Sequence, residues 1–397
     1  MKTIYALTVL ALPAITACTS DIPTVNLGID DSYRIERMRK LVLSPALTGA
    51  AYRWSVDGVT VSTDREYIFL RAEEGTYDLT FEIIDPDTPY RHDFTVTVMH
   101  EEVEYSPYIS RVYEYCPAPG QFVNEMPRYE DGDTYADILK KAEESISGTN
   151  DVMITLGGYG GYVTFGFDHT VINTPGQYDF RIWGNCFYEL TDPSRPGGSA
   201  EPGIVEVSYD INNNGLPDDP WYELAGSEYD NPATRHRYTV TYHRPDPGRD
   251  IIGDATGNLT DLHYIIWNDS EGASGHIAQN IFHRQDYYPR WIDTDAMSFT
   301  GSCLPRNAVD TSGDDSYFIL YSYPWGYVDN HPNEYADLNS FDISRAVDTD
   351  GHPVDLPGAD FIRVYTGVNQ SCGWLGETST ELCRAQDLHI DTPNQFY

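Results

Sequence analysis

The sequence predicts an all-β protein made of two successive β-sandwiches, with one or two helices in the second. Apolar and polar residues alternate with a period of two in many short runs, and turn residues separate these runs. The aromatic residues are mostly amphipathic, with 31 Tyr and 7 Trp against 14 Phe. Alternation is typical of antiparallel sheets that bury one face, and amphipathic aromatics favour strands.

The composition limits the partners of the chain. Its 397 residues contain 25 Lys and Arg against 62 Asp and Glu, which gives a formal net charge of −37. Such a polyanion repels phosphate backbones and anionic lipid headgroups, so the sequence argues against nucleic-acid binding and electrostatic membrane docking. With 40% hydrophobic and 22% charged residues, the chain is globular, and its length favours two domains.

The N-terminus has the pattern of a bacterial secretory signal. Residues 1–17 contain Lys2, a short apolar run and small residues, too short to cross a bilayer as a mature helix. Ile15-Thr16-Ala17-Cys18 matches the lipobox that lipoprotein signal peptidase reads. On that match Cys18 is lipidated and residues 18–24 form a lipidated linker, so the lipid anchor is the only membrane attachment. The open alternative is an ordinary secreted protein with a cysteine near its cleavage site.

Five further cysteines leave the disulfide pairing open. They are Cys116, Cys186, Cys303, Cys372 and Cys383, and an odd number cannot all pair within one chain. An oxidising envelope permits disulfides, but a chain of this length does not require them. No spacing typical of a Cys/His zinc site occurs.

Residues 25–100 form the first predicted domain. Strand-like runs cover residues 52–56, 67–70, 75–83 and 94–98, and we expect Trp54 to lie in the core. The tryptophan strand followed by the strand Gly75-Thr-Tyr77 resembles the PKD-like, immunoglobulin-like modules of bacterial surface proteins. That resemblance implies a spacer domain.

Residues 105–397 form the second predicted domain, after a polar connector. One helix is predicted from Thr134 to Ser147, capped by Asp133 or Thr134 and ended by Gly148. The predicted strands lie at residues 152–156, 162–167, 178–182, 204–208, 317–320 and 361–365. This pattern predicts a β-sandwich of the jelly-roll type.

Three segments of this domain carry a further resemblance. Residues 156–168, 179–185 and 200–208 look like a carbohydrate-binding-module-type jelly roll of secreted bacterial proteins. Together with the lipobox, the first domain and residues 113–122, they make the chain resemble a family of Bacteroidetes cell-surface lipoproteins. Some members accompany vitamin B12 uptake loci, so the resemblance implies a cobamide as ligand and a TonB-dependent transporter as partner, by association only.

The strongest local motif is an oxygen-rich loop. It reads Asp210-Ile-Asn212-Asn-Asn214-Gly215-Leu216-Pro-Asp218-Asp219, with Glu223 beyond. Oxygen ligands at alternate positions around a glycine turn are typical of calcium sites, and the loop resembles the first nine positions of dockerin and thrombospondin-type loops. Trp221 replaces the usual closing acid, which leaves Asp219 or Glu223 to close a structural calcium site. The predicted ligands are Asp210, Asn212, Asn214, Leu216, Asp218 and Glu223. The alternative is a polar hairpin loop built on Asn214-Gly215.

Catalytic motifs are absent from the sequence. There is no serine elbow, no His-Glu-x-x-His motif and no phosphate loop, and the glycines of 157–161 favour a tight backbone approach at a strand junction. We therefore expect no enzyme and nominate no catalytic residue. A glycosidase pair of carboxylates stays open, because their separation depends on the fold.

Histidines offer a weaker candidate site. His169 follows Asp168, and His276 and His283 flank an amide pair. Neutral imidazole can bind a transition metal or the cobalt of a cobamide. We favour the alternative that these histidines make hydrogen bonds within the protein.

Aromatic residues interleaved with amides mark the predicted ligand contacts. They occur in residues 265–291 and 323–330, which we interpret as loops, and the alternative is that they fill the core. Flat rings beside directional polar groups suit a sugar ring or the edge of a corrin. The predicted contacts are Trp267, Asn268, Tyr287, Tyr288, Trp291, Trp325 and Tyr327.

The sequence therefore favours one function over two alternatives. It predicts a surface-exposed outer-membrane lipoprotein that binds a small ligand, a cobamide, for delivery to a transporter. The first alternative is a glycan-binding protein or adhesin of a polysaccharide-utilisation system. The second is a glycoside hydrolase or esterase on the same scaffold.

Overall fold

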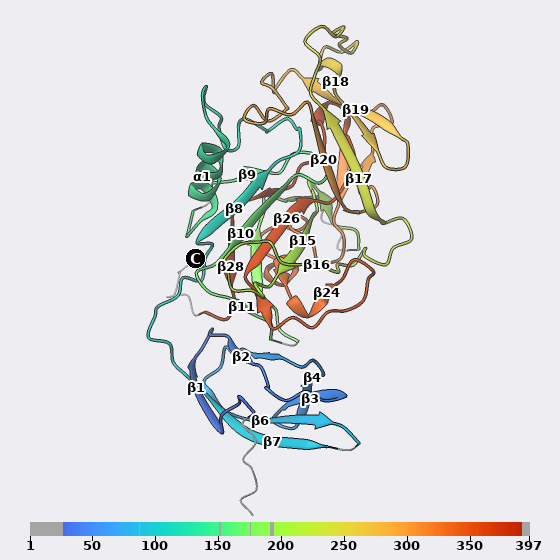
Figure 1. The fold of residues 1–397 in the computed structure, drawn as a ribbon. Helices are drawn as coiled ribbons and strands as arrows, with labels where there is room; N and C mark the ends of the chain where they lie inside the picture. The colour runs from blue at the N-terminus through green and yellow to red at the C-terminus, as the bar shows by residue number, and fades with distance from the viewer. Residues whose placement is uncertain (1–26, 87, 151, 175, 191–193, 391–397) are drawn as a thin grey trace, which may run out of the picture. The chain divides into compact units, whose positions relative to one another are not determined.

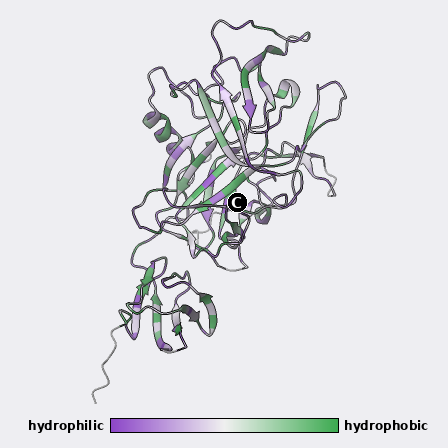
Figure 2. Cartoon of the chain, turned by 45° about the vertical axis from the view of Figure 1, so that its right-hand side comes forward, coloured by the Kyte–Doolittle hydropathy of each residue, from purple (hydrophilic) through white to green (hydrophobic). Residues whose placement is uncertain are grey.

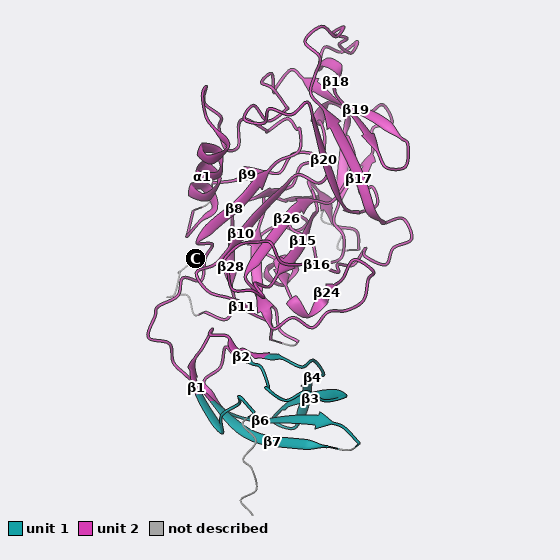
Figure 3. Cartoon of the chain, viewed as in Figure 1, with its two compact units in different colours: residues 1–33, 42–67, 77–96 teal, residues 34–41, 68–76, 97–397 magenta. Residues whose placement is uncertain are grey.

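A computed structural model describes residues 27–390, except residues 87, 151, 175 and 191–193. The predicted signal peptide and Cys18 lie outside the described residues. The chain divides into two compact units, residues 1–33, 42–67 and 77–96, and residues 34–41, 68–76 and 97–397 (Figure 3). Every sheet takes its strands either from residues 32–99 or from residue 111 onward. In the described part strands prevail and α1 is the only α-helix, so the all-β class is confirmed.

The first region, residues 32–99, contains a five-stranded sheet of order β1-β7-β6-β3-β4 (Figure 1). It also contains a two-stranded sheet of β2 and β5. Its strands are β1 (Ser32–Glu36), β2 (Leu41–Leu43), β3 (Ala51–Val56), β4 (Val59–Ser62), β5 (Tyr67–Phe69), β6 (Gly75–Ile84) and β7 (Tyr90–Met99). Leu79, Phe81 and Ile83 alternate with more exposed residues along β6, and the hydropathy of Figure 2 alternates likewise along strands. Trp54 is buried, and its ring centroid lies 4.4 Å from that of Phe81. Its predicted place in the core is confirmed.

A six-stranded antiparallel sheet forms the centre of the second region, with the order β24-β16-β15-β26-β10-β8. Its strands are β8 (Arg111–Cys116), β10 (Tyr162–Gly166), β15 (Gly203–Ser208), β16 (Trp221–Leu224), β24 (Ala346–Val347) and β26 (Phe361–Thr366). Val364 of β26 pairs with Val163 on one side and Val205 on the other, and all three are fully buried.

Smaller sheets complete the second region. They have the orders β23-β12-β28, β13-β14-β22-β21, β11-β25 and β27-β9. The strands are β9 (Ile154–Thr155), β11 (Val171–Ile172), β12 (Phe180–Trp183), β13 (Tyr188–Leu190), β14 (Gly197–Gly198), β21 (Ala308–Asp310), β22 (Phe318–Tyr321), β23 (Ser340–Phe341), β25 (Gly358–Ala359), β27 (Glu381–Leu382) and β28 (Arg384–Asp387). Three 3-10 turns are η1 (Ala336–Asn339), η2 (Ile343–Arg345) and η3 (Gly373–Leu375). Phe180, Ile182 and Ala385 share one hydrophobic cluster with the central sheet, which makes a sandwich core.

The helix α1 (Tyr135–Ile146) begins where the sequence predicts. The Thr134 hydroxyl accepts a hydrogen bond from the Asp137 backbone N–H, and the Asp137 carboxylate accepts one from the Thr134 N–H, which completes a capping box. The buried face of the helix packs against β8 through Ile138, Ala142 and Ile146. Among the described residues no helix has the length and hydropathy that a bilayer crossing needs.

Another four-stranded sheet, separate from the sheet of β13, β14, β22 and β21, has the order β19-β18-β17-β20 (Figure 1). Its strands are β17 (Arg235–His243), β18 (Leu259–Asp269), β19 (Ser274–Asn280) and β20 (Ala296–Cys303). The interpretation of residues 265–291 as loops is therefore wrong for residues 265–269 and 274–280, which are strands, while residues 270–273 and 281–291 lie outside strands and helices. Along β18 Ile265 is buried, whereas Ile266 and Asn268 are exposed on the other face. Because an apolar residue lies on the exposed face, the sequence of this strand lacks the alternation of apolar and polar residues that predicts a strand.

Candidate functional site

A cavity of about 190 Å³ lies beside the sheet formed by β17, β18, β19 and β20. Three strands of that sheet contribute to it, and so do the loops that follow β9, β20 and β26. We call it the tryptophan cavity, and its lining residues are Gly158, Tyr159, Tyr242, Trp267, His276, Ile277, Arg306, Asn369, Gln370, Ser371, Glu377 and Thr378. The lining thus combines flat rings, carboxamides, a guanidinium group and one carboxyl group.

The aromatic rings of the tryptophan cavity are held in fixed positions. Trp267 of β18 pairs with Gly275 of β19, and a Cβ atom at Gly275 would lie 2.4 Å from the indole Cζ2. The half-buried indole therefore covers the glycine backbone. The Tyr242 hydroxyl donates to the Tyr159 carbonyl at 3.2 Å, and the Tyr159 hydroxyl donates to the Tyr238 carbonyl at 3.0 Å. These bonds fix the rings before any ligand arrives.

The glycine-rich segment borders the cavity and needs its glycines. Gly157 has φ +67°, and a Cβ atom there would lie 1.9 Å from the Ala118 carbonyl oxygen. Gly160 has φ +83°, and its Cβ would lie 2.3 Å from the Phe299 Cβ. Gly158 lines the cavity itself. The predicted tight backbone approach is confirmed.

The polar groups at the cavity wall are positioned by the loops beyond β20 and β26. Gln370 accepts from the Asn307 N–H at 3.2 Å and donates to the Thr378 hydroxyl at 2.9 Å. Asn369 donates to the Tyr238 hydroxyl at 3.2 Å. A second Gln370 N–H donates to the Asn307 side chain at 2.6 Å, so both donors of this carboxamide are used within the protein. Asn369 is the lining carboxamide that keeps a donor for a ligand.

Glu377 supplies the carboxyl group of the tryptophan cavity. Its residue is 6% exposed, and its Oε1 accepts from the Gln121 backbone N–H at 2.6 Å. Its Oε2 is buried and has no hydrogen-bond partner among the described residues. Burial raises the pKa of Glu377 to about 7. The sequence gives no hydropathic signal for this residue, because the polar segment 377–381 is buried throughout.

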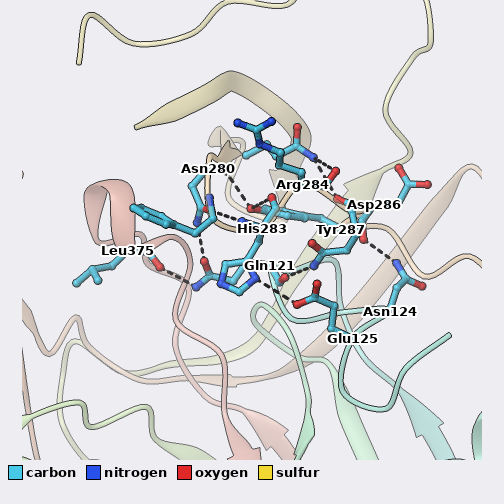
Figure 4. A network of polar contacts seen from close by, with 12 residues as sticks. Gln121, Asn124, Glu125, Asn280, His283, Arg284, Asp286, Tyr287 and Leu375 are labelled. Atoms are coloured by element: carbon cyan, nitrogen blue, oxygen red, sulfur yellow. Dashed lines mark hydrogen bonds and ion pairs between the residues drawn. The ribbon is translucent and has the colours of Figure 1, made fainter. Parts of the chain in front are cut away.

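A polar network holds Gln121 and so places Glu377. The Gln121 Nε2 donates to the Leu375 carbonyl at 2.7 Å, and the Asn280 Nδ2 donates to the Gln121 Oε1 at 2.7 Å (Figure 4). The predicted contact Tyr287 belongs to this network, where its hydroxyl accepts from the Asn280 N–H at 3.1 Å. It is fully buried, so its ring serves the core.

Three acidic residues of the second region lie close together. Carboxylate oxygens of Glu201, Asp329 and Glu381 all lie within 4.8 Å of one another, and we call these residues the carboxylate cluster. Asp329 accepts from the backbone N–H groups of Asn185 at 2.7 Å and Cys186 at 2.8 Å. Burial raises the pKa of Asp329 to about 7, and burial with the charge of Asp329 raises that of Glu381 to about 8. Such a group shares protons or holds a hard divalent cation.

The predicted calcium ligands converge in the loop between β15 and β16. The two carboxylate oxygens of Asp210 accept from the N–H groups of Asn214 at 3.1 Å and Gly215 at 2.8 Å. The side-chain amides of Asn212 and Asn214 donate to the Asp218 carboxylate, at 3.4 Å and at 3.1 and 3.2 Å. Their oxygens are those a calcium ion would take, together with the Leu216 carbonyl.

Glu223 lies apart from that loop. It sits on β16, where its Oε2 accepts from the Ser302 hydroxyl of β20 at 2.5 Å. Burial raises its pKa to about 8. Asp219 lies within the loop and accepts from the Ile211 N–H at 3.2 Å. Of the two closing acids that the sequence left open, the geometry favours Asp219.

The other predicted ligand contacts do not gather around Trp267. Tyr288 and Tyr327 are buried, and their hydroxyls bond the Thr294 carbonyl at 2.9 Å and the Glu228 N–H at 3.0 Å. Trp291 is half-buried, with its ring centroid 6.3 Å from those of Tyr115 and Tyr129.

Asn268 and Trp325 lie elsewhere again. Asn268 is exposed and accepts from His243 at 2.6 Å. Trp325 lines a separate cavity of about 190 Å³, with the Arg345 guanidinium 4.1 Å from its ring centroid. Of the seven predicted contacts, Trp267 is the one that lines the tryptophan cavity.

Two of the three candidate histidines, His169 and His283, bond carboxylates of the protein, and His276 lines the tryptophan cavity. His169 is buried between Asp168 at 2.8 Å and Asp387 at 2.7 Å, so the favoured interpretation of a hydrogen-bonding histidine is confirmed for this residue. In the described residues no disulfide joins the five cysteines beyond Cys18.

Comparison with known proteins places the first region in a family. Residues 23–85 match the PKD-like domain, so the N-terminal part of the chain is a PKD-like domain, as predicted. The matched residues cover a small part of the chain and leave the second region unassigned.

Two further likenesses are distant. Chitin synthase C of Emericella nidulans is 22% identical over 226 residues, which are 51% of this chain and 18% of the synthase. The chain thus spans less than a fifth of that relative. A quinonprotein alcohol dehydrogenase-like protein from Bacteroides thetaiotaomicron is 15% identical, with a TM-score of 0.17 over 49% of this chain and 35% of that chain. Neither likeness assigns an activity to this protein.

Proposed function

We propose that this protein binds a small polar ligand, a sugar ring, in the tryptophan cavity. The observation that carries the proposal is that the indole of Trp267, the carboxamide of Asn369 and the carboxyl group of Glu377 line one concave site. An aromatic face covers the apolar side of a sugar ring, while amides and a carboxyl group bond its hydroxyls. This is the glycan-binding alternative that the sequence left open.

The size of the cavity favours a sugar over a cobamide. Its volume of about 190 Å³ is below the range of about 300–1,000 Å³ of pockets that enclose drug-sized ligands. A corrin is larger than a drug-sized ligand and would extend far beyond the walls. The cobamide that the resemblance implies is therefore an alternative outcome of the binding experiment.

Binding without turnover fits the chemistry of the lining residues. A glycoside hydrolase of the usual kind needs two carboxyl groups that flank the scissile bond. Glu377 is the one carboxyl group among the described residues that line the cavity. We therefore favour a binding protein over a glycosidase or esterase.

The remaining parts of the chain suit a surface protein. The lipobox at residues 15–18 supports a lipid anchor at Cys18 in the outer membrane, facing the cell surface. The PKD-like domain would then act as a spacer between the anchor and the cavity. We propose that the ligand passes to a TonB-dependent transporter, as in the uptake systems that the family resemblance implies.

Titration of the full chain tests the proposal. Glucose, galactose, mannose, xylose and N-acetylglucosamine are added to wild type and to folded Trp267→Ala, and binding is followed by ligand-observed NMR. Loss of an aromatic anchor costs about 2 kcal/mol, so we expect roughly 30-fold weaker binding. Trp325→Ala, which alters the other cavity, is the matched control and should bind as wild type does.

The opposite results are equally clear. If no sugar binds and cyanocobalamin changes its visible absorbance on titration, the cobamide alternative replaces the glycan one. If sugars bind equally to wild type and Trp267→Ala, the site lies elsewhere. Release of free sugar from a glycan panel would establish an enzyme.

A further inference from the structure

We infer that Glu377 selects the ligand of the tryptophan cavity by charge, so that the site takes an amino sugar best and rejects a uronic acid. The inference rests on the proposed function, because it concerns the same site. It names the ligand class and the residue that determines it. No part of it depends on the calcium loop or on the carboxylate cluster.

The carboxyl group of Glu377 lacks a donor for one of its oxygens. Glu377 lines the cavity, is 6% exposed and bonds only one oxygen, through the Gln121 N–H at 2.6 Å. Within the described part of the chain, its Oε2 has no hydrogen-bond partner. A buried carboxyl group without such a partner is unfavourable. A ligand ammonium group in the cavity would be attracted by the charge of this carboxylate.

Two basic side chains also line the wall, Arg306 and His276, and burial lowers the pKa of His276, which favours its neutral form. Arg306 is exposed, and its Nε and Nη2 donate to the carbonyls of Ala308 at 3.1 Å and Ser371 at 3.0 Å. These bonds hold the guanidinium group on the backbone, so it does not present a free fork to a ligand carboxylate. The formal net charge of −37 further disfavours anionic ligands.

Glu377 is also held in place by its neighbours. Gln121, which binds its Oε1, is itself fixed by Leu375 and Asn280 (Figure 4). A Cβ atom at Gly120 would lie 2.5 Å from the same Oε1, so the backbone approaches the carboxyl group closely. A group held from two sides cannot swing out to solvent when a ligand enters. Above its raised pKa of about 7 the group is a carboxylate, and its charge then acts on the ligand.

Three sugars with one ring and different charge test the inference. Glucosamine, glucose and glucuronate are titrated into the full chain and into Glu377→Gln, which keeps the size and the Oε1 acceptor. We expect affinity to fall in that order for wild type. In Glu377→Gln the ratio of glucosamine to glucuronate affinity should fall by about tenfold, the value of one hydrogen bond to a charged group. Glu144→Gln, an exposed acid on α1, makes the same change of net charge and should leave the ratio unchanged.

The outcomes separate this inference from the proposed function. If none of the three sugars binds wild type, the proposed function fails and the inference fails with it. If the sugars bind but the ratio is the same in Glu377→Gln and wild type, the sugar site stands and charge selection by Glu377 is wrong. Preference of wild type for glucuronate would also overturn the inference. Trp267→Ala should weaken all three sugars alike, which distinguishes a platform from a selector.

Discussion

His169 illustrates how a buried polar residue stabilises this fold. Its side chain is fully buried and bonds Asp168 through Nδ1 at 2.8 Å and Asp387 through Nε2 at 2.7 Å. Asp387 ends β28, so the contact ties the last strand to the loop that follows β10. The two carboxylates give the imidazole a partner at each nitrogen, which favours its charged form.

The charge state of His169 predicts a pH dependence of stability. Burial opposes the charged imidazole, but the bonds to Asp387 and Asp168 outweigh burial and raise its pKa above 6.5. A raised folded-state pKa stabilises the protein fully at a pH below 6.5, and this contribution is lost as the pH rises through the folded-state value. We expect His169→Gln to flatten the fall in unfolding free energy between pH 6 and pH 9.

Denaturant unfolding of the two proteins across this pH range measures the effect. His352 is the matched control, because its side chain is 75% exposed and pairs only with Asp348 at 3.4 Å. His352→Gln should keep the pH dependence of wild type. A His169→Gln protein with the slope of wild type would show that other groups cause the dependence.

At the scale of elements, local pattern predicts part of the fold. The helix over 134–147 and the strands near 162–167, 204–208 and 361–365 are found within about a residue of their predicted positions. Their signals are local, since a capping residue, alternation and turns lie in the sequence itself.

The sheet that carries the tryptophan cavity escaped prediction, and so did most of the site. Polar and aromatic residues on both faces of β18 and β19 hide the alternation. Trp267 could be predicted from its aromatic surroundings. Glu377 could not, because it reaches the cavity through contacts between residues more than 250 positions apart. Such contacts depend on topology, which one sequence does not encode in local pattern.

The calcium prediction belongs to the loop between β15 and β16. A cation bound only by the folded loop adds its binding free energy to stability, about 2.7 kcal/mol at a hundred times its dissociation constant. We expect calcium to raise the melting temperature of chelated protein. Asp210→Ala should abolish that rise, because Asp210 lies at the centre of the loop's hydrogen bonds.

A second variant decides where the ion binds. Glu381→Gln removes a carboxylate of the carboxylate cluster and leaves the loop intact. If the calcium effect persists in Glu381→Gln and is lost in Asp210→Ala, the loop is the site. The reverse pattern would move the ion to the cluster. No calcium effect in wild type would reduce the loop to a polar turn.

At the scale of the whole molecule, the two regions differ in architecture, and we propose that they differ in task. The PKD-like region builds a conventional core around Trp54. The second region combines its sandwich core with a separate sheet and two cavities of about 190 Å³ each. A domain that needs only a stable core and a domain that must place polar groups around a cavity have different requirements. A spacer and a binding domain meet them separately, which is the division of labour that we propose.

The lipid anchor is the last prediction, and it concerns the entire chain. The lipobox at residues 15–18 predicts that Cys18 carries the acyl chains, and the charge of −37 gives no other attraction to anionic membranes. Cys18→Ala should therefore move the protein from the membrane fraction to the soluble fraction, with its sugar binding intact. Washed membranes from cells that express each form, probed by immunoblot, give the measurement. Cys116→Ala, a change of another cysteine, is the control and should stay with the membrane. A Cys18→Ala protein that still pellets with washed membranes would show that something other than the acyl chains attaches it.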